Sequence, residues 1–410
     1  MMALTQVRVK LEDTWTVLTY NAATGRYEGE LTAPGTSIHQ PGGYYSLTVE
    51  ARNATGQTAS LSGEQYKALR LVVRETAAPR LALLSPPAGY VTTASPAIVF
   101  RASDEAGGSG IDTASGQAAI DGVSVPCTVA VSGTAYSLTI QARSLAEGPH
   151  TVTAAISDRD GNRTGASAAY TVDTVPPALS LVMESLHRVV EDARLVVSGY
   201  ARDATSGIGE VTVAGIRAEL EEKGRFSVAV PLEVGENRIQ VTARDRAGLT
   251  ASQELYRLRM ITDRAQEDRD VLDALLAKPL EDWTAAERSW FDAGVVRGAY
   301  NADDLNRVGL AVELIAGWMH QAGYLAPVAP KTDWEPLDVP VRSQMTAYLA
   351  DVAALRDQFP LQAPEVPADM EDLELQEAND IETILVRADE TLEMLSKSFW
   401  VCGEPVCGGY

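Results

Sequence analysis

One stretch of the chain reads Val241-Thr242-Ala243-Arg244-Asp245-Arg246-Ala247-Gly248. Its first residues alternate between apolar and polar, which predicts a β-strand with one buried face. Asp245 stands three residues before Gly248. This spacing is typical of a hairpin turn, because an Asx side chain accepts hydrogen bonds from turn amides and glycine tolerates positive φ. The stretch therefore predicts a strand that turns back into a second strand.

The same strand and turn occur twice more upstream. The other copies are Val49-Glu50-Ala51-Arg52-Asn53-Ala54-Thr55-Gly56 and Ala154-Ala155-Ile156-Ser157-Asp158-Arg159-Asp160-Gly161. An earlier loop is repeated as well: Ala102-Ser103-Asp104 leads to Ser109-Gly110-Ile111, and Ala201-Arg202-Asp203 leads to Ser206-Gly207-Ile208. Internal repeats of this kind indicate several copies of one β-domain.

Alternating runs also predict which residues face each core. The predicted core residues are Tyr45, Leu47, Val49 and Ala51, then Val152, Ala154 and Ile156, then Phe226, Val228, Val230, Ile239, Val241 and Ala243. The intervening residues of the first run, Tyr44 to Glu50, are expected to face outward.

Prolines mark the joints between these β-domains. Ala77-Ala78-Pro79 and Val175-Pro176-Pro177 interrupt strand patterns, and proline cannot donate to a β-ladder. The sequence therefore predicts three β-sandwiches, at residues 1–76, 77–174 and 175–259.

Beyond Met260 the apolar period changes from two residues to about 3.6, which predicts helices. We expect a helical module at residues 260–363 and an acidic C-terminal helix and tail at residues 364–410. The predicted caps are Thr262 or Asp263, Thr284 with Glu287, and Asn301 or Asp303, and Gly323 is expected to end the third helix. That helix carries an apolar stripe of Leu305, Val308, Val312, Ile315 and Met319.

The last helix carries apolar residues at a 3–4 spacing from Ala378 to Phe399. This spacing fits a short coiled-coil seam, but the flanking positions lack paired charges, so packing against the other helices is favoured. Acidic residues dominate from Glu365 to Glu393, with Arg387 as the one basic residue, and they are expected to form a solvated face.

The composition limits the classes of function. The 410 residues carry a net charge of −22, whereas nucleic-acid binding needs a basic footprint, and an acidic membrane surface would repel the chain. No apolar stretch approaches a membrane span, and the N-terminal residues do not resemble a signal peptide. Three cysteines argue against a disulfide framework, while pairing of Cys402 with Cys407 stays open.

The residues give little indication of catalysis. The four histidines, at positions 39, 150, 187 and 320, are far apart and lack a zinc-ligand spacing. No phosphate loop and no nucleophile elbow is present. The prediction is a protein without catalytic residues or a cofactor, although a glycosidase pair among the many carboxylates stays open.

Two groups of residues are candidates for binding sites, one for calcium and one for a glycan. Asp158, Asp160 and Asn162 offer oxygens at alternate positions for calcium, with Asp104 and Glu105 if their loop is adjacent. A plain hairpin turn explains the same residues better. Tyr44, predicted to face outward beside Gly43, is a candidate for stacking on a surface glycan.

The β-repeats and the Asp173-Thr174-Val175-Pro176-Pro177 joint resemble bacterial immunoglobulin-like domains, over residues 1–258. A second resemblance, over residues 260–405, is to a C-terminal module of tail-associated proteins in phages and prophages of Gram-positive gut bacteria. The motifs that carry it are Gly298-Ala299-Tyr300-Asn301-Ala302-Asp303-Asp304-Leu305-Asn306-Arg307-Val308, Pro330-Lys331-Thr332-Asp333-Trp334 and Glu377-Ala378-Asn379-Asp380-Ile381-Glu382.

These resemblances imply a structural protein of a phage tail or baseplate, such as a tail fibre or adhesion component. The sandwiches would be spacers or weak binders of host-surface glycans, and the helical module would dock to other tail proteins or form a trimer or hexamer. The chain would assemble in the host cytoplasm and belong to the virion. The alternatives are a bacterial surface adhesin, which should show export and anchor signals, and a glycan-active enzyme with accessory sandwiches.

Overall fold

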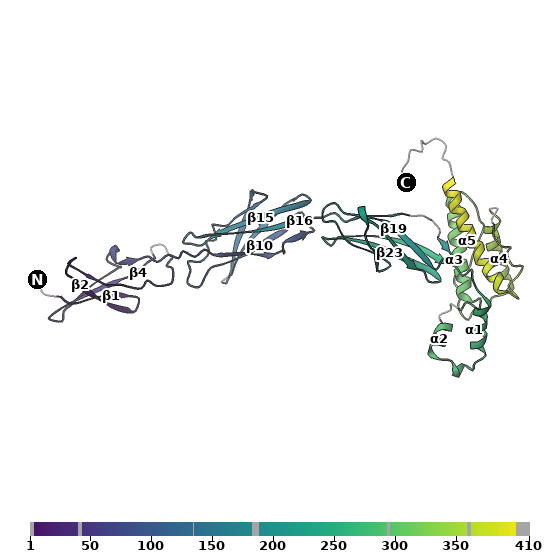
Figure 1. The fold of residues 1–410 in the computed structure, drawn as a ribbon, viewed down its shortest axis with the longest axis horizontal. Helices are drawn as coiled ribbons and strands as arrows, with labels where there is room; N and C mark the ends of the chain where they lie inside the picture. The colour runs from purple at the N-terminus through teal and green to yellow at the C-terminus, as the bar shows by residue number, and fades with distance from the viewer. Residues whose placement is uncertain are drawn as a thin grey trace, which may run out of the picture. The chain divides into compact units, whose positions relative to one another are not determined.

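The structure is a computed structural model that describes residues 4–39, 43–133, 135–182, 188–292, 296–358 and 362–398, with side chains up to residue 395. It divides into two compact units, Met1–Val175 and Pro176–Tyr410. Immunoglobulin-like β-sandwich domains occupy residues 4–259 and five α-helices follow (Figure 1). The predicted fold class, and the change from strands to helices near residue 260, are confirmed.

The first domain is built on a five-stranded sheet with the order β3-β2-β1-β5-β6, beside a two-stranded ribbon of β4 and β7. Its elements are β1 (Leu4–Leu11), β2 (Thr14–Asn21), β3 (Arg26–Glu28), β4 (Tyr45–Ser46), β5 (Thr48–Asn53), β6 (Thr58–Ser62), the 3₁₀ turn η1 (Lys67–Leu69) and β7 (Arg70–Leu71).

The core of this domain is thin. Val49 pairs with the buried Val9, so it lies on the predicted face, yet Val49 and its outward neighbours Thr48 and Glu50 are all half-buried. The strict alternation predicted for residues 44–51 is therefore wrong. The reason is that a ribbon of two short strands, rather than a second full sheet, lies beside this sheet.

The second domain packs two antiparallel-rich sheets, β13-β14-β10-β8 and β12-β11-β15-β16-β9. Its strands are β8 (Arg80–Ser85), β9 (Gly89–Val91), β10 (Ala97–Ser103), β11 (Gln117–Ile120), β12 (Val123–Val125), β13 (Cys127–Ser132), β14 (Ala135–Gln141), β15 (Gly148–Ser157) and β16 (Arg163–Val172). Val152, Ala154 and Ile156 are buried in its core, as predicted.

The third domain repeats this arrangement with sheets β17-β19-β22 and β18-β24-β23-β20-β21. Its elements are β17 (Ala178–Val182), β18 (Val189–Val190), β19 (Arg194–Arg202), β20 (Ile208–Val213), β21 (Ile216–Arg217), η2 (Glu222–Gly224), β22 (Arg225–Pro231), β23 (Gly235–Asp245) and β24 (Thr250–Arg259). The six core residues predicted on β22 and β23 are all buried.

The repeated turn has the predicted geometry in all three domains. Gly56, Gly161 and Gly248 have φ values of +83°, +95° and +99°. The side chains three residues earlier accept hydrogen bonds from turn amides: Asn53 from Thr55 and Gln57, Asp158 from Asn162, and Asp245 from Gly248 and Leu249.

In the second domain the chain starts and finishes at opposite ends. Arg80, at the start of β8, pairs with Ser103 beside the Asp104 loop. The last strand, β16, begins at Arg163 opposite Ser157 and finishes nine residues later at Val172. At about 3.3 Å per residue, the chain advances by roughly 30 Å across the domain.

The helical region consists of α1 (Gln266–Leu276), η3 (Leu280–Asp282), α2 (Ala285–Asp292), α3 (Ala302–Gln321), α4 (Arg342–Arg356) and α5 (Leu375–Ser398). Asn301 caps α3, and Thr284 and Glu287 form the expected reciprocal cap of α2. The predicted cap of α1 is wrong, because that helix begins after Ala265 while Thr262 donates to Glu191 and Asp263 accepts from Arg297. None of the described helices has the length and apolarity needed to cross a bilayer.

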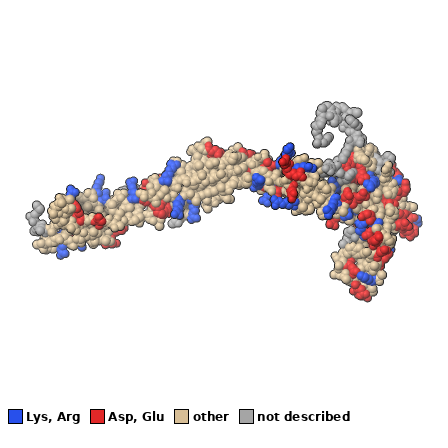
Figure 2. Space-filling view, in the orientation of Figure 1, with Lys and Arg blue, Asp and Glu red and all other residues tan. Residues whose placement is uncertain are grey.

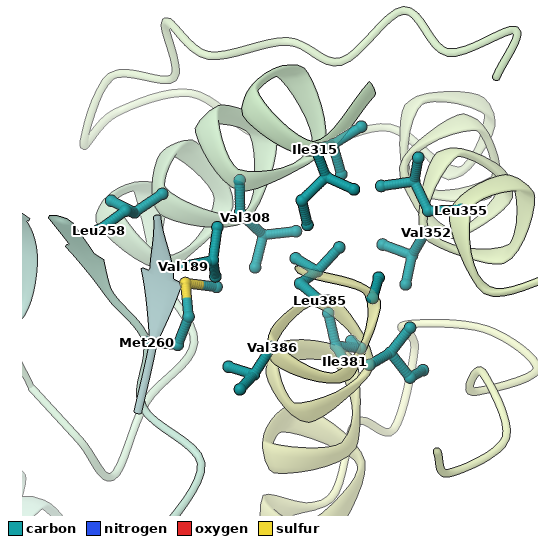
Figure 3. Packing of buried hydrophobic residues seen from close by; sticks show 14 of the residues in the cluster. Val189, Leu258, Met260, Val308, Ile315, Val352, Leu355, Ile381, Leu385 and Val386 are labelled. Carbon is teal, nitrogen blue, oxygen red and sulfur yellow. The ribbon is translucent and has the colours of Figure 1, made fainter. Parts of the chain in front are cut away.

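The third sandwich and the helices share one hydrophobic core. Val189, Leu258 and Met260, at the end of the sandwich, are at most 1% exposed and pack with Val308 of α3 and Leu385 of α5 (Figure 3). Leu349 and Val352 of α4 belong to the same core. Helix α5 is therefore part of the helical module, and its apolar stripe packs against the other helices from Ile381 to Leu395, within the part that the structure describes.

Part of the acidic segment is buried rather than solvated. Glu382 of α5 is fully buried, and its Oε1 accepts hydrogen bonds from Arg264 at 2.5 Å and Arg307 at 2.6 Å. Asp304 accepts from the same two arginines, so two acids and two bases neutralise one another. Burial alone would lower the pKa of Arg264, but the adjacent Glu382 and Asp304 carboxylates raise it.

A second buried acid holds the sandwich to the helices. Asp389 is 1% exposed and its Oδ2 accepts from the amides of Arg188, at 2.9 Å, and Val189. The prediction of a solvated acidic face holds only for other members of the segment, such as Glu365 and Glu371. Figure 2 shows acidic residues on the surface of the helical module. Glu382 and Asp389 are buried because arginines and backbone amides that are distant in the sequence pack against α5.

Candidate metal centre

Three carboxylates meet where the first sandwich joins the second. Glu75 lies in the connecting segment, Asp104 follows β10, and Asp158 lies in the β15–β16 turn. One oxygen from each lies within 4.8 Å of the other two. The three belong to one compact unit and come from segments 29 and 54 residues apart (104 − 75 and 158 − 104).

Backbone and hydroxyl donors hold each carboxylate in place. Glu75 Oε1 accepts from the amide of Ser109 at 2.7 Å and from the Ser109 hydroxyl. Asp104 Oδ2 accepts from the amide of Gly110 at 2.7 Å. Both oxygens of Asp158 accept from Asn162, one from its amide and one from its side chain. The carboxylates are therefore fixed by a loop and a turn that the sequence repeat already identified.

Two oxygens in the cluster remain without a donor. Glu75 Oε2 and Asp104 Oδ1 are buried and accept no hydrogen bond. Within the described ranges, neither these two residues nor Asp158 forms an ion pair with a lysine, arginine or histidine. An unsatisfied buried oxygen costs about 1–3 kcal/mol, more when it is charged. The arrangement therefore favours a bound cation.

Glu105 shows how crowded the negative charge is. A hydrogen bond from its own backbone amide acts to lower its pKa. That effect is outweighed by the adjacent Glu75 carboxylate, by burial and by the adjacent Asp104 carboxylate, so the pKa of Glu105 is raised. Like charges close together disfavour the ionised form of each carboxyl group.

Gly108 lets the loop approach the acids closely. A Cβ at this position would lie 2.5 Å from Glu75 Oε2 and 2.7 Å from Asp104 Oδ2. Any larger residue would therefore push into the space between the two carboxylates.

The other predicted calcium residues have different roles. The carboxylate of Asp160 accepts from the Ser37 hydroxyl at 2.5 Å and from the Glu75 amide at 3.0 Å, and lies 3.3 Å from His39 Nδ1. Burial acts to raise the pKa of Asp160, but these hydrogen bonds lower it. The side chain of Asn162 donates to Asp158 and to the Glu75 carbonyl. Both residues tie the first sandwich and the linker to the second sandwich.

Glu75 was missing from the sequence prediction. A usable indication was present, since Glu75 stands four residues before Pro79, as Asp173 stands four before Pro177 in the next joint. In the third sandwich, Asp203 and Asp245 occupy the repeat positions of Asp104 and Asp158. Asp203 accepts from the amides of Ser206 and Gly207, as a turn requires.

Tyr44 does not present a free ring. The guanidinium of Arg70 lies 4.1 Å from the centre of the ring, and the residue is half-buried. Its pKa is raised by burial and by a hydrogen bond with Glu64. One face of this candidate glycan platform is thus already covered.

The described histidines do not converge. His39 contacts Asp160, His320 is exposed at the end of α3, and His150 lies 2.6 Å from Asp121 through Nδ1 and 2.9 Å from the Ala146 carbonyl through Nε2. His187, Cys402 and Cys407 lie outside the described residues. Cys127 is a free thiol whose pKa is raised by burial.

The His150 contact predicts a pH dependence of stability. Hydrogen bonding to Ala146 and Asp121 raises the pKa of His150, so its stabilisation is complete below the ordinary pKa of about 6.5 and is lost as pH rises through the raised value. His150→Gln should lower the free energy of unfolding by about 1 kcal/mol or less at pH 5.5, and by less at pH 8. Thermal unfolding in EDTA at both pH values measures this, with His320→Gln as the exposed control. An equal effect of His150→Gln at both pH values would contradict the assignment.

One protein family and several solved structures are similar to parts of this chain. Residues 187–256 match the family described as glucodextranase, domain B. The fibronectin(III)-like modules of Clostridium thermocellum CbhA are 16% identical, covering 44% of this chain and 95% of theirs, with a TM-score of 0.32. Titin domains A168–A170 are 13% identical, covering 63% of this chain and 99% of theirs, with a TM-score of 0.34.

A tetra-tandem repeat from the extending region of a large adhesion protein is 20% identical. It covers 62% of this chain and 67% of its own, with a TM-score of 0.26. The search of curated proteins gave no match. By its own strands and helices, the chain consists of tandem immunoglobulin-like β-sandwiches with a helical C-terminal module.

Proposed function

We propose that this chain is a non-enzymatic structural protein of a phage tail or baseplate, assembled in the host cytoplasm and retained in the virion. The observation that carries the proposal is the single core shared by the last sandwich and the helical module. Such a core fixes the helical module to the third sandwich. The tail assignment itself comes from the resemblance of the helical motifs to tail-associated proteins.

The sandwiches suit the role of spacers. In the second domain the chain advances from one end to the other, because β8 starts beside the Asp104 loop and β16 finishes at the far end. A domain with this connectivity adds its own length to the distance between the segments on either side. Large clefts are not required for such a role.

The helical module suits docking to other tail proteins or to further copies of this chain. Large apolar side chains on α1, η3 and α2 are exposed: Val271 by 57%, Leu280 by 63% and Phe291 by 39%. Exposed apolar groups of this kind are typical of contact surfaces. The resemblance implies a symmetric trimer or hexamer, in which each copy would cover such groups on its neighbour.

The proposal includes weak binding of a host-surface glycan by the protein. A groove of about 690 Å³ between the third sandwich and α3 is lined by Tyr256 and Trp318 together with Arg188, Arg238 and three glutamates. Aromatic rings beside charged groups are suited to weak contacts with sugars. Incubating the protein with host-wall polysaccharide should therefore yield no cleavage products, and release of oligosaccharides would contradict the non-enzymatic assignment.

Composition analysis of particles tests the tail assignment. Tailed particles purified from the strain that encodes this chain should contain it in a fixed copy number, in a multiple of three per tail if the trimer or hexamer forms. Quantitative mass spectrometry against the major tail protein measures that number. Particles that lack the chain, while the strain expresses it, would contradict the proposal.

A further inference from the structure

We propose that the joint between the first and second sandwiches binds one calcium ion through the carboxylates of Glu75, Asp104 and Asp158, and that the ion fixes this joint. The proposal concerns residues of one compact unit and does not depend on the tail assignment. Three oxygens from separate segments lie within 4.8 Å of one another, and two carboxylate oxygens in the cluster are buried without a donor.

The spacing fits a calcium ion. Calcium takes six to eight oxygens at about 2.3–2.6 Å, so any two of its ligands lie at most about 5 Å apart. The three carboxylate oxygens meet this limit, and backbone carbonyls or waters would supply the remaining ligands. The cluster consists of oxygens alone, a donor set that hard cations prefer over zinc or copper.

The donor pattern also distinguishes a metal site from a simple turn. A turn needs an Asx side chain to accept from amides, and Asp104, Asp158 and Asp203 all do so. A hairpin turn does not require a further carboxylate from the linker, yet Glu75 places one at the same point. Nor does a turn explain why the facing oxygens, Glu75 Oε2 and Asp104 Oδ1, are buried and left without a donor.

The ion would act on the joint because its ligands come from both sides of the linker. Glu75 follows the first sandwich, whereas Asp104 and Asp158 belong to loops of the second. The contacts around it already hold the two domains: Ser37 donates to Asp160, and the Ser37 amide donates to the Gly107 carbonyl at 2.9 Å. Bound calcium would hold Glu75 in this arrangement. The linker should therefore be cleaved more slowly by proteases when calcium is present.

Calorimetric titration of the full chain with calcium chloride tests binding. Glu75→Gln and Asp104→Asn should each bind one calcium fewer per chain than the wild type, or bind it at least about tenfold more weakly, because each removes a charged ligand. Gly108→Ala should have the same effect without changing any charge, since its Cβ would crowd Glu75 Oε2. Because the number of calcium ions bound by each variant is compared with that of the wild type, the test stays valid if the chain binds calcium at other sites.

Two matched controls separate the site from general effects. Asp13→Asn removes an acid whose side chain is fully exposed, and Gly35→Ala adds a Cβ with nothing within 4 Å. Both should bind calcium as the wild type does. Magnesium chloride at the same concentrations should compete weakly, because magnesium demands a tighter octahedral site.

Stability with and without calcium distinguishes a metal site from a structural role. In EDTA, Glu75→Gln should unfold at the same temperature as the wild type or higher, since it relieves repulsion among uncompensated acids. In calcium it should unfold at a lower temperature than the wild type. A variant that is less stable in both conditions by the same amount would show a structural role only, and the proposal would be wrong.

Protection of the linker gives a second readout. Arg74 is exposed and precedes Glu75, so trypsin should cut there at least about tenfold more slowly in calcium than in EDTA. Cleavage at Arg342, 78% exposed in the other unit, reports the activity of the protease itself. The protection should be absent in Glu75→Gln and Gly108→Ala. Failure of the wild type to bind calcium at millimolar concentration, or equal cleavage rates with and without it, would overturn the proposal.

Discussion

Replacing Glu382 with glutamine should lower the free energy of unfolding of the unit 176–410 by about 3–5 kcal/mol. The substitution keeps the shape of the side chain and an oxygen that can still accept from the Ile261 amide. It removes the charge that Arg264 and Arg307 share, so two buried guanidiniums would face Asp304 alone. An uncompensated charge inside a protein costs far more than a lost surface pair.

Urea unfolding measures this effect, followed by tryptophan fluorescence. Trp283, Trp290, Trp318 and Trp334 lie in the described part of the helical region, so the fluorescence reports mainly on that region. The matched control is Glu390→Gln on the same helix, because Glu390 pairs with Arg387 at a half-exposed position. The control should cost less than about 1 kcal/mol. Equal losses in the two variants would contradict the description of Glu382 as a buried counter-ion.

Replacing Met260 with alanine should lower the stability of the same unit by about 2–5 kcal/mol. Met260 is 1% exposed, and it lies between the end of β24 and the helices (Figure 3). Shortening it would leave a cavity beside Val189, Leu258 and Val386. Since that core belongs to both parts, the sandwich and the helices should lose stability together.

Two probes check whether they do so. Circular dichroism at 222 nm follows the helices and the signal near 218 nm adds the strands, while fluorescence follows the tryptophans; their transitions should coincide before and after the substitution. Met394→Ala, at a position 60% exposed, is the control and should change stability by about 0.5 kcal/mol or less. Separate transitions, with only the helical one shifted, would mean that the shared core does not couple the two parts.

The sequence was sufficient to predict the strands of the second and third sandwiches, because each strand has one buried and one exposed face. Alternation then follows directly from the two faces of a sheet: Val152, Ala154 and Ile156 are buried as predicted, and so are Ile239, Val241 and Ala243. The first sandwich differs because its sheet has little cover, so residues 44–51 show no clear alternation. A pattern of residue types cannot reveal how much of a second layer lies over a strand.

The candidate site was only partly predictable for a related reason. Asp158 and Asp104 belong to repeated local motifs, whereas Glu75 lies in a linker and meets them only through tertiary packing. The acids of α5 show the same limit. Glu382 and Glu390 are indistinguishable in a list of charges, yet one lies on buried arginines that precede it by 118 and 75 residues. Burial of charge is decided by distant partners rather than by local composition.

The short parallel strand pairs have a mechanical consequence. In the second sandwich β9, near the start of the domain, pairs in parallel with β16, its last strand, and β18 pairs in parallel with β24 in the third. A pull on the chain at the two ends of either domain would slide these partners past each other. Their hydrogen bonds would then share the load and have to break together, whereas an antiparallel hairpin opens one bond at a time. We therefore expect this pairing to raise the force needed to unfold either domain along its strands.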